Sequence, residues 1–179
     1  MTHITLAVTG SISAYKAADI TSQLTKLGFE VKVLMTPSAQ KFITPLTLQV
    51  LSKNPVGLEV MVEDDPQRIE HIDIGKETDL FLVAPASANT IAKLAMGLAD
   101  NMVTSTALAL PQNTKKLLAP AMNTKMLEHP ATQRNLKLLQ DYGYQIIQPR
   151  DAVLACGDKG SGALATIEAI VEAVKENCL

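Results

Sequence analysis

The hydrophobic pattern of the chain alternates between short apolar runs and longer stretches with apolar residues at helical spacing. The runs of strand length lie at residues 3–9, 30–35, 79–84, 115–119 and 144–148. The helical patterns lie at residues 12–27, 36–52 (in two pieces, separated near Pro45), 91–98, 101–110, 130–142 and 166–177. Strands that alternate with helices predict a parallel sheet with helices on both faces. We therefore expect a doubly wound, three-layer α/β domain of the flavodoxin or Rossmann kind.

Two segments interrupt this alternation. Residues 55–68 have few apolar positions and three consecutive acidic residues, so a loop or an edge is expected there. Residues 149–165 contain three glycines within six positions, which is too many for an ordinary helix or strand, and we expect a mobile loop. With no internal repeat and no linker, residues 1–179 are expected to form a single domain.

The composition agrees with this fold and excludes some partners. Hydrophobic residues make up 47% of the chain but aromatic residues only 3%, so aliphatic side chains must build the core, as in sheets covered on both faces. The net charge is −2 and there is no dense block of Lys or Arg, so nucleic acid is not an expected partner.

The cysteines and the start of the chain bear on its compartment. Two cysteines, Cys156 and Cys178, are too few for a disulfide scaffold and indicate a reducing environment. The chain opens on a strand without a basic and apolar leader, and no apolar run approaches the roughly 18 residues of a membrane span. We expect a cytoplasmic protein with no membrane partner.

The loop after the first strand carries part of a nucleotide-binding pattern. Dinucleotide enzymes have G-x-G-x-x-G here, but only Gly10 is present, and Ile12 and Tyr15 occupy the later glycine positions. A P-loop sequence is also absent. The pattern disfavours a pyrophosphate ligand such as NAD and leaves a site for a single phosphate.

Similar polar residues follow other strands of the expected sheet. Those with hydroxyl or amide side chains are Ser11, Ser38, Ser87, Asn89 and Thr90. Each alone is more typical of a helix cap than of a binding site. Because the carboxyl ends of parallel strands meet at one edge, the set together indicates a mononucleotide, with FMN as the example known for flavodoxin-like sheets.

The stretch 120–126 follows the fourth strand and combines an amide with thioethers. Asn123 can donate and accept hydrogen bonds, and Met122 and Met126 offer soft apolar surface. This suits a polar group held against a flat ring. A capped loop with two core methionines would have the same pattern, so the residues alone leave both interpretations open.

Several motifs together resemble a known family. The strings PASANT at 85–90, PAMNTKM at 120–126 and ACGDKG at 155–160, with His71-Ile72 upstream, are similar in order and spacing to the homo-oligomeric flavin-containing cysteine decarboxylases. The resemblance extends from Thr9 to about Leu164. It departs from the family pattern after Met126, where a Trp is usual and Leu127 stands here. The loss of that aromatic side chain removes packing area but no polar chemistry.

The resemblance implies a set of site residues and a cofactor. It assigns FMN as cofactor and no metal. The residues that match phosphate- and ribityl-binding positions, with two that line the flavin, are Gly10, Ser11, Ser38, Ser87, Asn89 and Thr90, and Met102 and Thr104. The residues that match catalytic positions are His71 as base, Asn123 as holder of the substrate carboxylate and Cys156 as proton donor. Met126 lies beside the substrate, and Lys125 is a candidate for its phosphate.

The resemblance also implies a reaction. Within the family, Cys156 matches a cysteine found in the branch that serves coenzyme A biosynthesis. That branch converts 4′-phosphopantothenoylcysteine to 4′-phosphopantetheine and CO₂ through thioaldehyde and ene-thiol intermediates. Alternatives are an oxidative decarboxylase of peptides with a C-terminal cysteine, a flavin prenyltransferase, and a flavin-binding regulatory subunit without catalysis.

The family implies partners as well. Its members assemble as trimers or higher oligomers such as dodecamers, with the flavin at subunit boundaries. The coenzyme A enzyme is often fused to a synthetase domain, which we do not expect within these 179 residues. The other expected partner is the small-molecule substrate.

Overall fold

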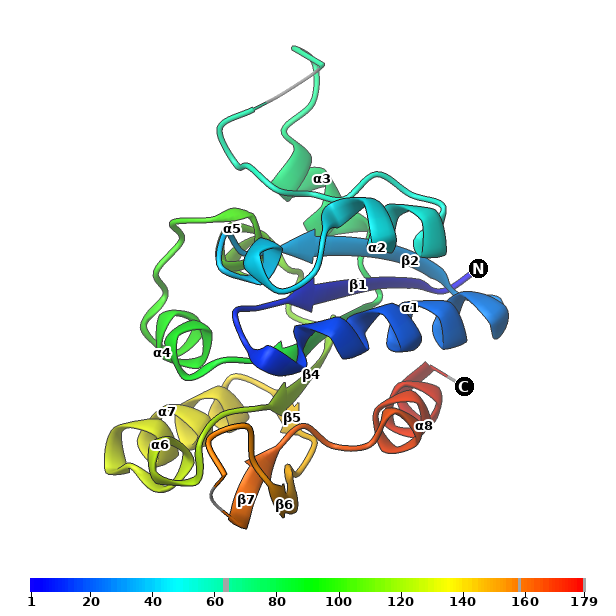
Figure 1. The fold of residues 1–179 in the computed structure, drawn as a ribbon. Coiled ribbons are helices and arrows are strands. Elements are labelled where there is room, and N and C mark those ends of the chain that lie inside the picture. The colour runs from blue at the N-terminus through cyan, green and yellow to red at the C-terminus, as the bar shows by residue number, and fades with distance from the viewer. Residues whose placement is uncertain (63–64, 158, 179) are drawn as a thin grey trace.

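The five expected strands form one parallel sheet (Figure 1). The computed structural model describes residues 1–62, 65–157 and 159–178. The sheet consists of β1 (His3–Val8), β2 (Glu30–Met35), β3 (Leu80–Ala86), β4 (Lys115–Pro120) and β5 (Tyr144–Ile146), in the spatial order β2-β1-β3-β4-β5. All neighbouring strands run parallel. This is the flavodoxin-like strand order, and it confirms the predicted fold class.

Alternation of side chains along each strand divides the core into two layers. Ile4, Leu6 and Val8 of β1 are fully buried on one face. This face packs against α1 (Ala17–Lys26), α2 (Pro45–Ser52) and α8 (Ile167–Cys178). The opposite face holds Phe81 and Val83 of β3. It is covered by α3 (Glu70–Glu77), α4 (Ala88–Met96), α5 (Met102–Ala109) and α7 (Pro130–Asp141). None of the described helices is long and apolar enough to span a membrane.

Local sequence signals fix where helices begin at the carboxyl edge of the sheet. The Ser87 hydroxyl caps α4 by accepting a hydrogen bond from the Thr90 N–H at 3.2 Å. Asn101 and Thr104 form a reciprocal capping box at the start of α5. Short 3₁₀ helices follow β1 at Ile12–Lys16 and β2 at Ala39–Lys41. The first turns of these helices therefore gather around one edge of the sheet.

The segment expected to be a mobile loop contains a β-hairpin. Strands β6 (Arg150–Val153) and β7 (Lys159–Ala163) pair antiparallel beside the carboxyl end of β4 (Figure 1). The expectation that this segment lacks regular structure was wrong, because Gly162, at φ +132°, lets the chain approach another segment closely. The mobility of the segment stays a prediction. A short helix, α6 (Thr124–Glu128), was also not expected, since five residues are too few for a periodic pattern.

Candidate active site

A cavity of about 480 Å³ opens at the carboxyl ends of the strands. Its walls come from the loop after β1, the start of α4, the start of α6 and the β6–β7 hairpin. Large apolar side chains that line it and are between 46% and 71% exposed are Ile12, Tyr15, Phe42, Met126 and Val153. Small-molecule sites typically measure roughly 300–1,000 Å³ and are mostly apolar. The cavity therefore has the size and lining for a ligand with a flat ring.

Two of the predicted catalytic residues meet in this cavity. The Asn123 amide nitrogen donates a hydrogen bond to the Cys156 sulfur at 3.2 Å. Asn123 caps α6, with its side-chain oxygen accepting from the Lys125 N–H at 2.9 Å, so the direction of its amide is fixed. Residues 33 positions apart in the sequence thus form one polar group at the end of β4.

Contacts with the start of α6 hold the hairpin over the cavity. The Met122 N–H donates to the Gly162 carbonyl at 2.9 Å, and the Thr124 hydroxyl donates to the Ser161 carbonyl at 2.6 Å. A Cβ at Gly162 would lie 2.3 Å from the Met122 carbonyl oxygen, and one at Gly160 would lie 2.8 Å from the Thr124 hydroxyl. Glycines here allow two backbones to meet, which brings Cys156 to Asn123.

The loops after β1, β2 and β3 form a second, neutral part of the site. A Cβ at Gly10 would lie 2.6 Å from the Ser38 Cβ, so these two loops touch. Gly10, Ser11 and Ser87 line the cavity. The buried Thr9 hydroxyl ties the loops together by donating to the Pro85 carbonyl at 2.7 Å and accepting from the Ser87 N–H at 2.8 Å. Sequence analysis assigned no role to Thr9, since nothing in its spacing separates it from an ordinary strand residue.

The remaining predicted cofactor residues lie further from the cavity lining. Asn89 is exposed on the first turn of α4, and Thr90 is 2% exposed and hydrogen-bonded to Ser87. Met102, 1% exposed, packs in the core behind the sheet, and Thr104 belongs to the α5 capping box. Within one chain the structure does not bring Met102 and Thr104 to this cavity, and their assignment stays a prediction.

Of the two residues predicted to contact the substrate beside Asn123, one lines the cavity and the other does not. Met126 lines the cavity, whereas Lys125 is exposed and is not part of its lining. Leu127, which replaces the family's Trp, is 8% exposed and packs in the core beneath α6. The replacement therefore changes packing behind the site rather than the cavity wall.

His71 lies on α3, away from the residues that line the cavity. Its Nδ1 atom is buried and has no hydrogen-bond partner among the described residues. A histidine so placed has capacity for a further polar contact. One chain by itself does not unite His71 with Asn123 and Cys156.

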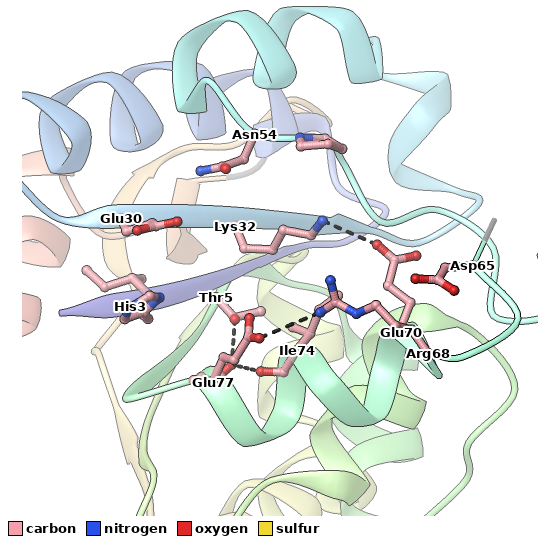
Figure 2. Close-up of a pocket in the computed structure, with 13 residues that line it drawn as sticks. His3, Thr5, Glu30, Lys32, Asn54, Asp65, Arg68, Glu70, Ile74 and Glu77 are labelled. Carbon is pink, nitrogen blue, oxygen red and sulfur yellow. Dashed lines mark hydrogen bonds and ion pairs between the residues drawn. The ribbon is translucent and has the colours of Figure 1, made fainter. Parts of the chain in front are cut away.

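A second cavity, of about 410 Å³, lies at the amino ends of β1 and β2 against α3 (Figure 2). Its charged side chains pair with one another: Lys32 with Glu70 at 3.2 Å, and Arg68 with Glu77 at 3.6 Å. None of the predicted site residues lines it. Ligands of open α/β sheets bind at the carboxyl ends of the strands, so the first cavity is the candidate active site.

The two cysteines differ in their surroundings. Cys156 is exposed at the cavity, whereas Cys178 lies near the end of α8. Burial, with a smaller contribution from the Asp79 carboxylate, raises the pKa of the Cys178 thiol. A raised pKa makes a thiol less reactive, so Cys156 is the cysteine suited to chemistry.

The residues of the site fit a mononucleotide with an apolar ring. The uncharged loop residues Gly10, Ser11, Ser38 and Ser87, three of which carry hydroxyls, can accommodate a single phosphate. The Flavoprotein family matches the whole chain, residues 1–179. The chain belongs to the Flavoprotein family.

Two relatives show what this Flavoprotein chain is similar to. It is 64% identical over 173 residues to a probable phosphopantothenoylcysteine decarboxylase of Streptococcus mutans, with 97% of each chain covered. It is 45% identical to the coenzyme A biosynthesis bifunctional protein CoaBC of Bacillus subtilis, where the match covers 98% of this chain and 43% of the relative. The chain therefore spans less than half of the bifunctional protein.

Solved structures of similar proteins have the same fold as this chain. A PPC decarboxylase mutant complexed with pantothenoylaminoethenethiol has a TM-score of 0.90 and 31% identity, covering 98% of this chain and 97% of that one. The FMN binding protein AtHal3 has a TM-score of 0.86 and 32% identity, covering 98% and 95%. The family and the fold expected from the sequence motifs are confirmed.

The contact between Thr124 and the hairpin can be tested by removing one hydroxyl. Thr124→Val keeps the shape of the side chain but loses the bond to Ser161, which is worth roughly 1 kcal/mol. We expect faster hydrogen–deuterium exchange of β6 and β7, by roughly fivefold. Thr124→Ser, which keeps the hydroxyl, is the control. Equal exchange in both variants would show that the hydroxyl does not hold the hairpin.

Proposed function

We propose that this protein catalyses the FMN-dependent decarboxylation of 4′-phosphopantothenoylcysteine to 4′-phosphopantetheine in coenzyme A biosynthesis. The observation that carries the proposal is the Asn123–Cys156 contact at 3.2 Å inside the cavity at the carboxyl ends of the strands. Support also comes from the Flavoprotein family and from the 64% identical relative named for this reaction.

The cofactor would lie where neutral loops and apolar side chains meet. Gly10, Ser11, Ser38 and Ser87 would hold its phosphate, and Met126 would lie against its ring system. When bound, FMN supplies the capacity to take a hydride from the substrate's thiol-bearing carbon and to return it after decarboxylation. FMN as cofactor is supported by the family and by the similar FMN binding protein.

Asn123 suits the substrate carboxylate because it is a neutral donor. A cation would stabilise the charged carboxylate that the reaction must lose, and so would favour the ground state over the transition state. The amide that would hold the carboxylate contacts the Cys156 sulfur in the cavity, so the proposed proton donor lies beside the group that would leave as CO₂. Loss of CO₂ from a thioaldehyde leaves electrons conjugated with C=S, as an ene-thiol.

Cys156 would complete the reaction by protonating the ene-thiol as it is reduced. Its position on the hairpin lets it reach the substrate only when the hairpin covers the cavity, which also excludes water. A decarboxylase of C-terminal peptidyl cysteine stops at the ene-thiol and needs no such donor. Placement of Cys156 beside Asn123 therefore favours the phosphopantothenoylcysteine reaction over the peptide reaction.

A homo-oligomer, trimeric or higher, would supply His71 as the base from a neighbouring subunit. Support comes from two observations: His71 does not line the cavity within one chain, and its buried Nδ1 atom has no hydrogen-bond partner among the described residues. We also propose a cytoplasmic location, since two cysteines in 179 residues are too few for a disulfide scaffold.

Cys156→Ser tests the assigned chemistry. The variant should still release CO₂ from 4′-phosphopantothenoylcysteine but accumulate the unsaturated ene-thiol, because the proton donor is lost. Product masses and CO₂ release, measured against the unaltered protein, give the result. Normal yields of 4′-phosphopantetheine from the variant would contradict the role of Cys156.

Mixed oligomers test the origin of His71. His71→Asn and Asn123→Ala should each abolish turnover, by at least about a hundredfold for loss of a base. If two subunits form each site, co-refolded mixtures should regain part of the activity, since some sites pair an intact His71 with an intact Asn123. Mixtures as inactive as either variant alone would contradict a shared site.

A further inference from the structure

The charged side chains that line the active-site cavity all have the same sign. Lys16 and Arg150 are the only charged residues among its described lining, and no carboxylate faces it. The whole chain, by contrast, carries a net charge of −2. A cavity with two cations and no acid attracts an anion of high charge.

Neither cation has an acidic partner in the described part of the chain. The Arg150 Nε–H donates to the Leu164 carbonyl at 3.1 Å, which fixes the plane of the guanidinium and leaves its two terminal nitrogens for other acceptors. Lys16 lies at the end of the 3₁₀ helix after β1, with its Nζ 6.0 Å from the centre of the Tyr15 ring. Both side chains are therefore available to a ligand, and an oriented guanidinium suits phosphate.

We propose that Lys16 and Arg150 bind the phosphate of the substrate and give the enzyme its preference for the phosphorylated compound. The inference rests on the proposed function. It replaces the sequence-based candidate Lys125, which is exposed outside the cavity lining.

The position of Arg150 favours the substrate's phosphate over the cofactor's. Arg150 begins β6, and Cys156 lies in the turn that follows the same strand. A ligand that contacts both Arg150 and Cys156 must therefore lie along the hairpin. The cofactor's phosphate has a separate neutral site at Gly10 and Ser87, on the loops after β1 and β3.

The lengths of hairpin and substrate agree. Arg150 and Cys156 are six positions apart in the sequence, and an extended chain of that length spans at most about 20 Å. The extended substrate measures roughly 16 Å from its sulfur to its phosphorus, from bond lengths of about 1.5 Å. With its thiol at Cys156, its phosphate can reach the start of β6. Binding of the phosphate there would also hold the hairpin against the cavity.

The test compares substrates with and without phosphate. We expect Arg150→Gln and Lys16→Gln each to lower kcat/KM for 4′-phosphopantothenoylcysteine by roughly tenfold or more, because a charge-assisted hydrogen bond is lost. For pantothenoylcysteine, which lacks the phosphate, kcat/KM should not change. Calorimetric titration with 4′-phosphopantetheine and with pantetheine should give the same contrast in binding. Arg150→Lys should retain part of the preference.

Two control variants that remove charges outside the cavity, and a titration with FMN, complete the experiment. Arg134→Gln on α7 and Lys26→Gln on α1 remove the same charges outside the cavity lining and should leave both substrates unaffected. An equal loss of kcat/KM for both substrates in Arg150→Gln would overturn the proposal. So would a higher FMN dissociation constant with an unchanged preference for the phosphorylated substrate. Absence of turnover of either substrate by the unaltered holoenzyme would instead refute the proposed function.

Discussion

The site depends on one contact, the docking of the β6–β7 hairpin on the start of α6. A backbone bond from Met122 to Gly162 and the bond from Thr124 to Ser161 hold two segments about 40 residues apart in the sequence. Between them lies Asn123, and the same docking brings Cys156 to its amide. Gly162 permits the approach, since any Cβ there would collide with the Met122 carbonyl. The residue that we propose to hold the carboxylate, Asn123, and the residue that we propose to donate the proton, Cys156, are therefore positioned together.

The parallel sheet supplies the other constraint. Because every strand of the five-stranded sheet runs in the same direction, the loops after β1, β3 and β4 open at one edge. Thr9 then connects the first two of these loops through Pro85 and Ser87. This edge combines the uncharged loops that we propose to bind the cofactor's phosphate with apolar side chains and the Asn123–Cys156 pair. At the opposite edge, Lys32 and Arg68 pair with carboxylates.

Periodicity predicted the sheet and its main helices because burial on two faces leaves a clear pattern in β1 and β3. It did not predict the hairpin, where Gly160 and Gly162 let the backbone lie close to the start of α6, a contact that only the tertiary structure reveals. Motif resemblance predicted Asn123 and Cys156 but could not show that they touch, or that His71 lies away from them within one chain. Sequence analysis did not single out Lys16 and Arg150, because an isolated cation in a sequence has no distinguishing pattern. Only the cavity shows that both line it and that its described lining contains no carboxylate.

We propose that Cys156, carried on the hairpin, lets this enzyme complete a reaction that a decarboxylase of peptidyl cysteine leaves at the ene-thiol. The most direct measurement is a competition assay in which the FMN-loaded protein receives 4′-phosphopantothenoylcysteine and a peptide ending in cysteine together, with products identified by mass. We expect the phosphorylated compound to lose CO₂ without losing hydrogen, which gives the saturated thiol, and the peptide to remain intact. A peptide that loses CO₂ and two hydrogens, with the phosphorylated compound unchanged, would contradict it.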